Sequence, residues 1–448
     1  MATDRQEAEA PTSMTAPKLF ECPDCGQMQI LPAMAPRSRA VCLRCDKVLR
    51  HTRRDSIGVC TALNLAAVVL FAIAGTLTMM SVSTAGQMRT ASLITGPEQL
   101  EQYGIWELSV VVLVTTFAAP LARTLCMLFV LLGLHMHRPR PVLRLAFSWV
   151  EHLRPWSMIE IYMLGLFVAY VRLSDMARIE LGPAVFALIG LMVILIAADV
   201  ALDDQAIWEA MEPPNRRDRI QARTAAIARM SETAHRFRIG CDTCGLVSRS
   251  APGMHCPGCG YRLRVRKNRS LEHTLAFSLA AAALYIPANT YPVLTIVQLG
   301  VGQPSTILGG VQELVAAGEW PLALLVFFAS IAVPVLKLIG LAILLISTRT
   351  GSIWRLHDRT VLYRIVDAIG RWSMIDIFME SILVGLVQFG KIVTVYPGPG
   401  AIAFSAVVIL TMLAARSFDP RLMWDALPHE TTDHAAVEQA ATPIEAGA

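Results

Sequence analysis

Eight of the ten cysteines stand in the spacing of a metal-binding site. They form two groups, each made of two Cys-x-x-Cys pairs: Cys22, Cys25, Cys42 and Cys45, then Cys241, Cys244, Cys256 and Cys259. Two intervening residues let both sulfurs of a tight turn face one ion, and two such turns make the tetrahedral sulfur cage that zinc favours. Each group predicts a small zinc ribbon with one structural Zn²⁺, because neither short segment can bury enough apolar surface to fold alone. Iron in the same cage, serving as an electron carrier, remains an alternative.

A second set of chemically suited residues lies inside apolar stretches of the second half of the chain. These residues are Ser330, Lys337, Ser373, Asp376, Glu380 and Thr411. Those of each stretch fall three, four or seven residues apart and so share one helical face. Because an unpaired ammonium in hydrocarbon is costly, we expect Lys337 to pair with Asp376 and Thr411 to complete the cluster. Buried amines and carboxylates can exchange protons, so the cluster predicts a proton-coupling relay; an ion pair that only holds two helices together is the alternative.

The first half offers a weaker version of this cluster, with Arg123 and Glu160 at the matching positions. We interpret these two as a structural ion pair, because arginine does not give up its proton. Pro287 and Pro292, with Asn289 between them, predict a helix that is kinked or unwound within the membrane. Such breaks are tolerated where the backbone lines a cavity or is buried in protein, so a packing kink is the alternative interpretation.

The composition of the chain indicates what kind of structure holds these residues in place. The chain has 448 residues, of which 54% are hydrophobic and 17% charged, and its mean hydropathy is +0.50. Soluble domains carry about 25% charged residues. The high hydrophobic fraction and the low charged fraction exclude a disordered protein, a nucleic-acid protein built on charge, and an ordinary soluble enzyme. No phosphate-binding loop, nucleophile elbow or His-Glu-x-x-His motif occurs in the sequence, which favours a protein that is not an enzyme.

Hydropathy predicts an α-helical membrane protein. A helix that crosses a bilayer needs about 20 apolar residues. Eight stretches meet that length or approach it: 57–80, 106–134, 158–174, 183–203, 271–296, 320–347, 373–394 and 399–416. Of the 39 lysines and arginines, 33 lie on alternate intervening segments that include both termini and both cysteine groups. The positive-inside rule places those segments in the cytoplasm, where disulfides are disfavoured.

Basic residues flank both cysteine groups. Around the second group they are Arg262, Arg264, Arg266, Lys267 and Arg269, and they adjoin the start of a predicted span. At that position basic side chains meet anionic lipid headgroups. We therefore interpret them as lipid contacts rather than as a nucleic-acid surface.

The two halves of the chain repeat one another. Trp156-Ser157-Met158-Ile159-Glu160 matches Trp372-Ser373-Met374-Ile375-Asp376, and further Pro, Trp and Asp residues match at the same spacing. We expect an all-α fold of two tandem four-helix membrane modules, each preceded by a ribbon. The expected segments are a disordered tail (1–17), the first ribbon (18–54), the first module (55–212), a linker (213–238), the second ribbon (239–268), the second module (269–427) and a disordered tail (428–448).

This order of ribbon and four spans, given twice, resembles the paraquat-inducible protein A (PqiA) family. The resemblance also rests on the Trp-Ser-Met-Ile-[Asp/Glu] motif and on the Pro-x-Asn-x-x-Pro stretch at 287–292. It implies a multi-pass inner-membrane protein of Gram-negative bacteria that moves phospholipid or another lipid together with a periplasmic MCE-domain tunnel protein. The family's polar network falls on Ser330, Lys337, Ser373, Asp376 and Thr411. A membrane scaffold that regulates the MCE partner without transporting, and a membrane redox protein, are the alternative functions.

Overall fold

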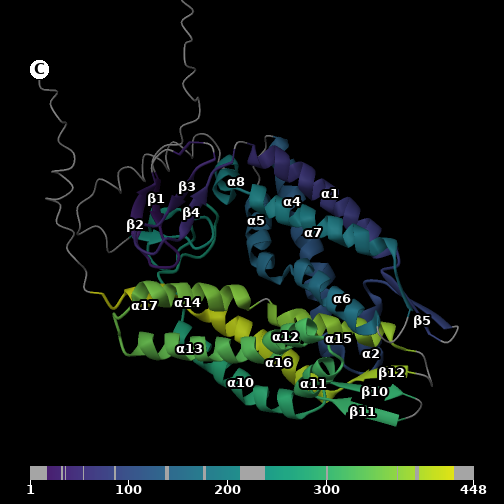
Figure 1. The fold of residues 1–448 in the computed structure, drawn as a ribbon. Coiled ribbons are helices and arrows are strands. Elements are labelled where there is room, and N and C mark those ends of the chain that lie inside the picture. Colours follow the sequence, from purple (N-terminus) through teal and green to yellow (C-terminus); the bar gives the residue numbers. More distant parts are fainter. Residues whose placement is uncertain are drawn as a thin grey trace, which may run out of the picture.

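The chain folds into a mostly helical structure. This structure, a computed structural model, describes residues 18–427 with gaps at 32–33, 36, 54, 85–86, 137–140, 175–177, 212–237, 299–300, 371 and 389–392. The tails predicted at 1–17 and 428–448 and nearly all of the linker at 213–238 therefore lie outside the described residues. Figure 1 shows a bundle of long helices with small hairpins at one end and two sheets at the other.

Seven helical stretches among the described residues have the length and composition of membrane spans. They are Ser56–Thr76, Trp106–His135, Pro141–Ser174, Pro183–Ala201, Ser270–Thr290, Trp320–Arg349 and Pro399–Ser417. They contain, in the first half, α1 (Ser56–Thr76), α3 (Trp106–Leu113), α4 (Ala119–His135), α5 (Pro141–Leu153), α6 (Ile159–Ser174) and α7 (Pro183–Ala201). In the second half they contain α10 (Ser270–Thr290), α12 (Trp320–Phe327), α13 (Val333–Arg349) and α16 (Pro399–Ser417). These stretches confirm a protein that crosses the membrane several times.

The span predicted at 373–394 does not form one long helix. α14 (Leu356–Ile369) precedes it, and α15 covers only Ile375–Leu386, which is 12 residues. At about 1.5 Å per residue α15 is roughly 18 Å long, against about 30 Å of hydrocarbon. The helix stops because Val387 leaves helical geometry and its carbonyl accepts from Val395 N, so the chain turns into a sheet.

The matching stretches Trp106–His135 and Trp320–Arg349 each contain one turn of π-helix. The π turns cover Val114–Ala118 and Phe328–Ala332 and join α3 to α4 and α12 to α13. Each is followed within two residues by a proline, Pro120 or Pro334. A proline has no N–H to give to the preceding turn, so the hydrogen-bond ladder shifts there.

The helix predicted to be kinked or unwound around Pro287 is not unwound. α10 continues through Pro287 and ends at Thr290, before Pro292. Side chains supply donors near the proline: Asn289 Nδ2 lies 2.8 Å from Tyr285 O, and Thr290 Oγ1 lies 3.1 Å from Ile286 O. A single proline this close to the end of a helix is thus absorbed without unwinding it.

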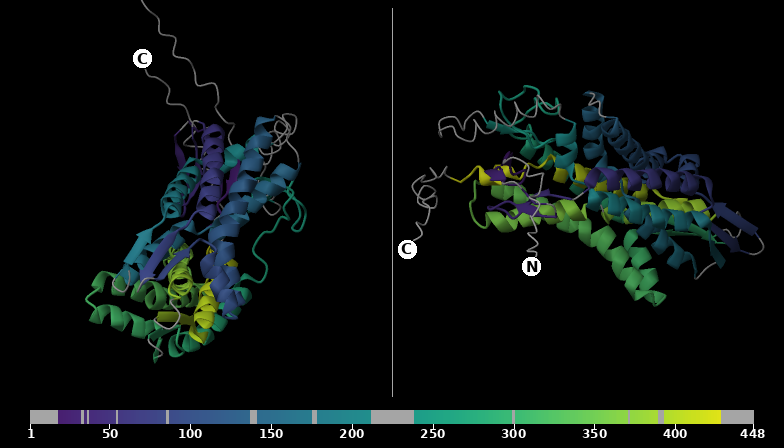
Figure 2. Two further views of the ribbon diagram at one scale, coloured as in Figure 1. Left: turned by 90° about the vertical axis from the view of Figure 1, so that its right-hand side faces the viewer. Right: turned by 90° about the horizontal axis from the view of Figure 1, so that it is seen from above.

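Two three-stranded antiparallel sheets, which hydropathy did not predict, lie at one end of the bundle (Figures 1 and 2). In the first, β5 (Met80–Thr84) lies between β6 (Gln87–Ala91) and β7 (Arg178–Leu181); in the second, β10 (Leu294–Gln298) lies between β11 (Val301–Ser305) and β12 (Val393–Pro397). The central strands pair in register over their lengths, as Val82 with Arg89 and Ile296 with Val395. The spans predicted to reach residues 80 and 296 stop being helical before those residues. The central strand of each sheet follows there instead.

The cysteine groups lie at the opposite end, on three hairpins. The first group is carried by β1 (Lys18–Glu21) with β2 (Met28–Leu31) and by β3 (Arg39–Val41) with β4 (Val48–His51). The second is carried by β8 (Arg238–Gly240) with β9 (Val247–Arg249) and by the loop that follows. Two short helices border them, α8 (Asp204–Ala210) and α17 (Arg421–Trp424).

The two halves share one apolar core, in which α15 of the second half packs against α6 and α2 (Thr95–Gln102) of the first. Glycines permit the close approach. A Cβ on Gly96 would lie 2.6 Å from Ser381 Oγ, and a Cβ on Gly385 would lie 3.0 Å from Gly96 Cα. Larger residues at these positions would force the two halves apart.

Candidate metal centres and buried polar sites

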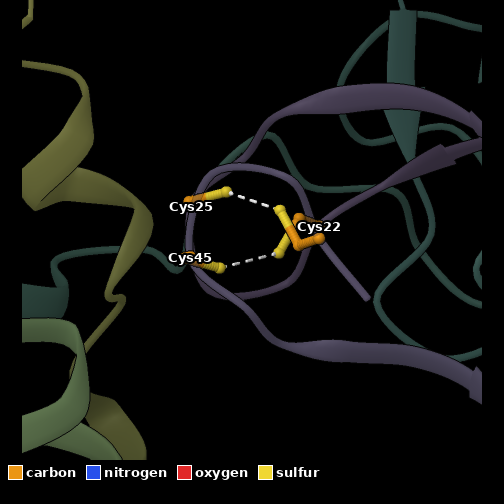
Figure 3. Close-up of side chains that lie close together, drawn as sticks. Cys22, Cys25 and Cys45 are labelled. Carbon is orange, nitrogen blue, oxygen red and sulfur yellow. Dashed lines mark hydrogen bonds between the residues drawn. The ribbon is translucent and has the colours of Figure 1, made fainter. Parts of the chain in front are cut away.

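The first cysteine group forms a closed sulfur cage. The four Sγ atoms lie within 4.8 Å of one another, with Cys22 Sγ 3.5 Å from Cys45 Sγ and Cys25 Sγ 3.5 Å from Cys42 Sγ. All four residues are buried. Figure 3 shows the sulfurs of Cys22, Cys25 and Cys45 turned toward a common centre.

The second group has the same geometry. Cys241 Sγ lies 3.5 Å from Cys259 Sγ, and Cys244 Sγ lies 3.6 Å from Cys256 Sγ. Backbone N–H groups of Gly258 and Tyr261 donate to the sulfurs of Cys256 and Cys259, at 3.3 and 3.4 Å. Donation of this kind suits sulfurs that carry negative charge, as metal-bound thiolates do.

Both cages fit a tetrahedral metal ion. Four sulfurs about 2.3 Å from a zinc ion lie roughly 3.8 Å apart, close to the separations found. Three of the four knuckles turn through glycines with positive φ (Gly26, Gly245 and Gly260), and the fourth turns through Asp46 at φ 56°. The eight predicted ligands are therefore brought together in the two predicted sets, and each set can hold one ion.

Each cage shares an apolar core with residues of the other half of the chain. The cysteines of the first group share a core with Leu344, Leu356, Phe418, Met423 and Trp424, all from the second half. Those of the second group share a core with Met127, Leu131, Phe147, Ile207 and Trp208, all from the first half.

Polar contacts reinforce this crossed arrangement. Arg364 of α14 donates from Nε to Asp24 Oδ2 and from Nη2 to Cys45 O, both at 2.7 Å. The two cages also meet directly, because Gly240 N donates to Glu21 Oε2 at 2.7 Å. Nothing in the sequence pattern indicated this crossing, since each cysteine group is adjacent in the chain to its own half.

A buried aspartate fastens the end of the last span of each half. Asp203 N and Asp419 N donate to Ser56 Oγ and Ser270 Oγ, at 2.9 and 2.8 Å. Asp419 accepts further bonds from Arg421 Nε at 3.0 Å and from the backbone N–H of Lys267 at 2.9 Å. Burial favours the neutral form of Asp419, but its bonds from Arg421 outweigh burial and hold its pKa below the ordinary value. At Asp203 burial outweighs the more distant arginine, Arg50, and the pKa is raised.

Lys337 is buried as predicted but does not pair with Asp376. Its side chain is 1% exposed, and its Nζ donates to Thr411 Oγ1 at 2.6 Å. No ion pair joins Lys337 to Asp376 in the part of the chain that the structure describes. Ser330, one helical turn before Pro334, is also buried and donates to Val326 O within its own helix. The predicted cluster is thus divided, with the amine and Thr411 on one side.

The acids of α15 face the first half instead. Asp376 and Glu380 line a cavity of about 40 Å³ together with Arg172, Thr306 and Phe404. Asp376 Oδ1, Glu380 Oε1 and Ser373 Oγ are buried without a hydrogen-bond partner among the described residues. The charge that acts on Asp376 is Arg172 of α6, whose Nη2 also lies 3.6 Å from Glu313 Oε2 on α11 (Ile307–Ala316).

Sequence reasoning missed Arg172 as a member of this site, because an arginine near the end of a weak span indicated an interruption rather than a partner. It also missed Asp199. Arg123 makes a bidentate ion pair with Asp199 of α7, not the predicted pair with Glu160. Asn289 bonds to the carbonyl of Tyr285 in its own helix, and Pro287 and Pro292 lie within and just after α10.

The chain matches one family twice. The family described as "Paraquat-inducible protein A" matches residues 58–212 and again residues 271–428. Intermembrane transport protein PqiA of Escherichia coli (strain K12) is 30% identical over 426 residues, which cover 92% of this chain and 97% of that protein. Lipophilic envelope-spanning tunnel protein A of the same strain is 31% identical over 411 residues, which cover 92% and 91%.

The similarity extends to a more distant bacterium. A probable intermembrane transport protein of Haemophilus influenzae is 25% identical over 422 residues, which cover 92% of this chain and 98% of that protein. No solved structure matches the chain. The matches to both halves confirm the resemblance that the ribbons and the repeated motif indicated, and this chain is a member of the paraquat-inducible protein A family.

Proposed function

We propose that this protein is the inner-membrane component of a lipid transport system. It moves phospholipid between the inner membrane and a periplasmic MCE-domain tunnel protein, and it is not an enzyme. Relatives named for intermembrane transport and for an envelope-spanning tunnel support this proposal. The observation that carries it is the pair of polar sites in the interior of a membrane protein, one at the buried Lys337 and one at Asp376 with Glu380, each of which buries a carboxylate oxygen without a hydrogen-bond partner among the described residues. Such groups are costly in a bilayer and are kept for a function.

The proposed architecture is two tandem membrane modules, 55–212 and 269–427, preceded by zinc ribbons at 18–54 and 239–268. Although α15 is short, the chain still crosses the membrane eight times. β12 follows α15 and pairs with β10, which follows α10, so both helices lead to the sheet end of the bundle. α16 then returns to the ribbon end. An even number of crossings keeps the ribbons and both termini on one side, which the basic residues identify as the cytoplasm.

Zn²⁺, rather than iron, is the proposed occupant of both cages. When bound, it supplies structural cross-linking of short hairpins that have little core of their own. The protein's own contribution is the crossed packing, which ties each ribbon to the opposite module. Elemental analysis of purified protein tests the assignment: two zinc ions per chain are expected, and an iron-loaded, coloured protein would favour the redox alternative.

Proton coupling is proposed at the acids of α15. Asp376 and Glu380 belong to the second half, whereas Arg172 belongs to the first, so their charges act across the contact between the halves. A proton taken up by one carboxylate neutralises it and weakens its attraction for Arg172. The contact between α6 and α15 then loosens, and the two halves are free to move relative to each other. Lys337 and Thr411, on the other side of the second half, complete the proposed relay with Ser330 and Ser373.

The test is lipid transfer by the protein reconstituted in vesicles with its MCE partner, with and without a proton gradient. Asp376→Asn is expected to abolish the response to the gradient. Asp358→Asn, an exposed acid paired with Arg355, is the matched control and is expected to leave it unchanged. If the wild-type protein carries no lipid in either condition while still binding the MCE partner, the scaffold alternative holds.

A further inference from the structure

A basic cavity lies where the second ribbon meets the membrane bundle. It has a volume of about 760 Å³ and is bounded by the loop 262–268, by His273 in the first turn of α10, and by Ser417 at the end of α16. Its charged lining residues are Arg262, Arg264, Arg266, Lys267 and His273, and no acid lines it among the described residues. Ligand sites in proteins commonly enclose about 300–1,000 Å³, so this volume suits a bound group rather than a single ion.

Two of these cations are already engaged and form the wall of the cavity. Arg266 makes a bidentate contact with Asp425, with Nη2 2.6 Å from Oδ1. Lys267 Nζ donates to the carbonyls of Arg416 and Phe418, at 2.6 and 3.0 Å, and so caps the end of α16. Burial lowers the pKa of Lys267 despite the nearby Asp419. These contacts fix the backbone of the loop against the bundle.

The other arginines of the cavity are free to bind a ligand. Arg262 and Arg264 are exposed, and neither has an acidic partner in the described parts of the chain. They alternate along the loop with the buried Leu263, which anchors it in the core of the second cysteine group. The loop therefore presents two unpaired guanidinium groups from a fixed backbone. Planar guanidinium groups bind phosphate oxygens in pairs, which is a geometry suited to a phosphate ester.

The cavity is placed at the level of a bilayer surface. α10 begins at Ser270, next to the cavity, and between about two and five turns further on it exposes Leu279 and Ile286, as a helix in contact with lipid does. α16 ends at Ser417, on the cavity's opposite wall. Both helices are candidate membrane spans, so the cavity opens where lipid headgroups lie. In a bilayer, this position beside the ends of two spans favours a lipid headgroup over a nucleic acid as the source of the phosphate.

We propose that this cavity binds the phosphate headgroup of an anionic phospholipid of the cytoplasmic leaflet, with Arg262 and Arg264 as the principal ligands. Basic pockets beside membrane helices on the cytoplasmic side hold such headgroups, each arginine contributing to the attraction. The inference rests on the proposed orientation with the ribbons in the cytoplasm. It goes beyond lipid transport, because a lipid held here anchors the second ribbon to the membrane at a site far from the acids of α15.

Native mass spectrometry of the purified full-length protein tests this proposal, with phosphatidylglycerol and phosphatidylcholine titrated separately. Wild-type protein is expected to bind phosphatidylglycerol roughly ten- to thirty-fold more tightly, the effect of two basic residues near a membrane surface. The double variant Arg262→Ala/Arg264→Ala should lose this preference, and Arg262→Lys/Arg264→Lys should keep most of it. Arg355→Ala, an exposed arginine at the start of α14 outside the cavity, is the matched control.

Other outcomes identify a different occupant or none. Equal binding of the two lipids by the wild-type protein, or an unchanged preference in the alanine variant, would overturn the proposal. Inorganic phosphate that displaces phosphatidylglycerol at equal concentration would assign the site to free phosphate, and tight binding of a short RNA instead would assign it to nucleic acid. Because the measurement needs neither the MCE partner nor a gradient, its failure would leave the transport proposal standing, and the reverse also holds.

Discussion

The two matched halves of the chain neutralise their buried cation in different ways. In the first half, Arg123 of α4 is held by both carboxylate oxygens of Asp199 on α7. In the second half, Lys337 of α13 donates a hydrogen bond to the hydroxyl of Thr411 on α16, and the carboxylate that acts on it is Asp367 of α14, without forming an ion pair. The same helix pair is thus joined by an ion pair in the first half and by an amine–hydroxyl hydrogen bond in the second. We therefore expect the first half to be the structural member and the second half the working one.

At the end of the bundle that carries the ribbons, by contrast, the two halves make nearly identical contacts between their first and last spans. Ser56 with Asp203, and Ser270 with Asp419, make the same backbone contacts between the first and last spans of each half. Duplication has kept the elements that fasten helices and changed the residues in the membrane interior. Specialisation of one copy is the simplest account of that contrast, and the predictions below test it.

The largest effect is expected from removing a cage. Structural zinc supplies about 10–16 kcal/mol in small zinc-binding units, so Cys22→Ser should unfold the first ribbon. Because that ribbon packs on the second half, hydrogen exchange should rise in α17 and around Phe418. Cys241→Ser should instead raise exchange in α8 of the first half.

Cys126→Ser is the control for the first variant, since this cysteine of α4 belongs to neither cage and lies outside the core of the first. It should leave exchange in α17 and around Phe418 unchanged. If each cage variant affected only the half that follows it in sequence, the crossed packing described above would be wrong.

The next effect separates function from stability. Lys337→Met should leave the free energy of unfolding nearly unchanged, because Thr411 Oγ1 keeps its bond to Val408 O, but should reduce lipid transport at least about tenfold. Arg123→Met strands Asp199, which is 34% exposed, and should cost roughly 1–3 kcal/mol, below the 3–5 kcal/mol of a fully buried pair. Transport per folded molecule should be retained in that variant.

The double change Arg123→Met/Asp199→Leu removes both charges and is expected to restore stability, measured as the unfolding temperature in detergent. Full transport by Lys337→Met would remove the distinction between a working and a structural half.

Some features of this molecule can be predicted from its sequence, and others cannot. The cages can be predicted from local spacing, because two Cys-x-x-Cys knuckles that lie close together in the chain can bring their four sulfurs around one ion. The seven long helices follow from hydropathy, and the burial of Lys337 follows from its place in α13. All of these are properties of segments taken one at a time.

The remainder depends on contacts between distant segments. No local pattern states that Asp376 shares a cavity with Arg172, more than 200 residues away, rather than pairing with Lys337. The crossed packing of the ribbons and the pairing of β12 with β10 are of the same kind. Pro287 shows the opposite error: a strong local rule predicted a kinked or unwound helix, and α10 nevertheless continues through this proline to Thr290.

A smaller effect compares the two fastening aspartates. Asp419→Asn loses charge-assisted bonds from Arg421 in a site that is 1% exposed, and should cost about 3 kcal/mol. Asp203→Asn should cost about 1 kcal/mol, since asparagine still accepts from Ala206 N and caps α8. Unfolding by denaturant measures both, and equal losses would show that Arg421 adds nothing to the second half.

The smallest effect is the dependence of those two losses on pH, and its sign differs between the halves. The pKa of folded Asp419 is lowered, so its contribution is complete above the unfolded pKa of about 4 and is lost as the pH falls further; the deficit of Asp419→Asn should shrink there. The pKa of folded Asp203 is raised, so the wild-type protein gains stability as the pH falls from neutral toward 4, and the deficit of Asp203→Asn should grow. Each variant is compared with the wild type at the same pH, which cancels the titration of all groups that the substitution leaves unperturbed. The losses of unfolding free energy in the two variants could instead change in the same direction as the pH falls. The two sites would then be alike in charge as well as in backbone geometry, and the halves would differ only within the membrane.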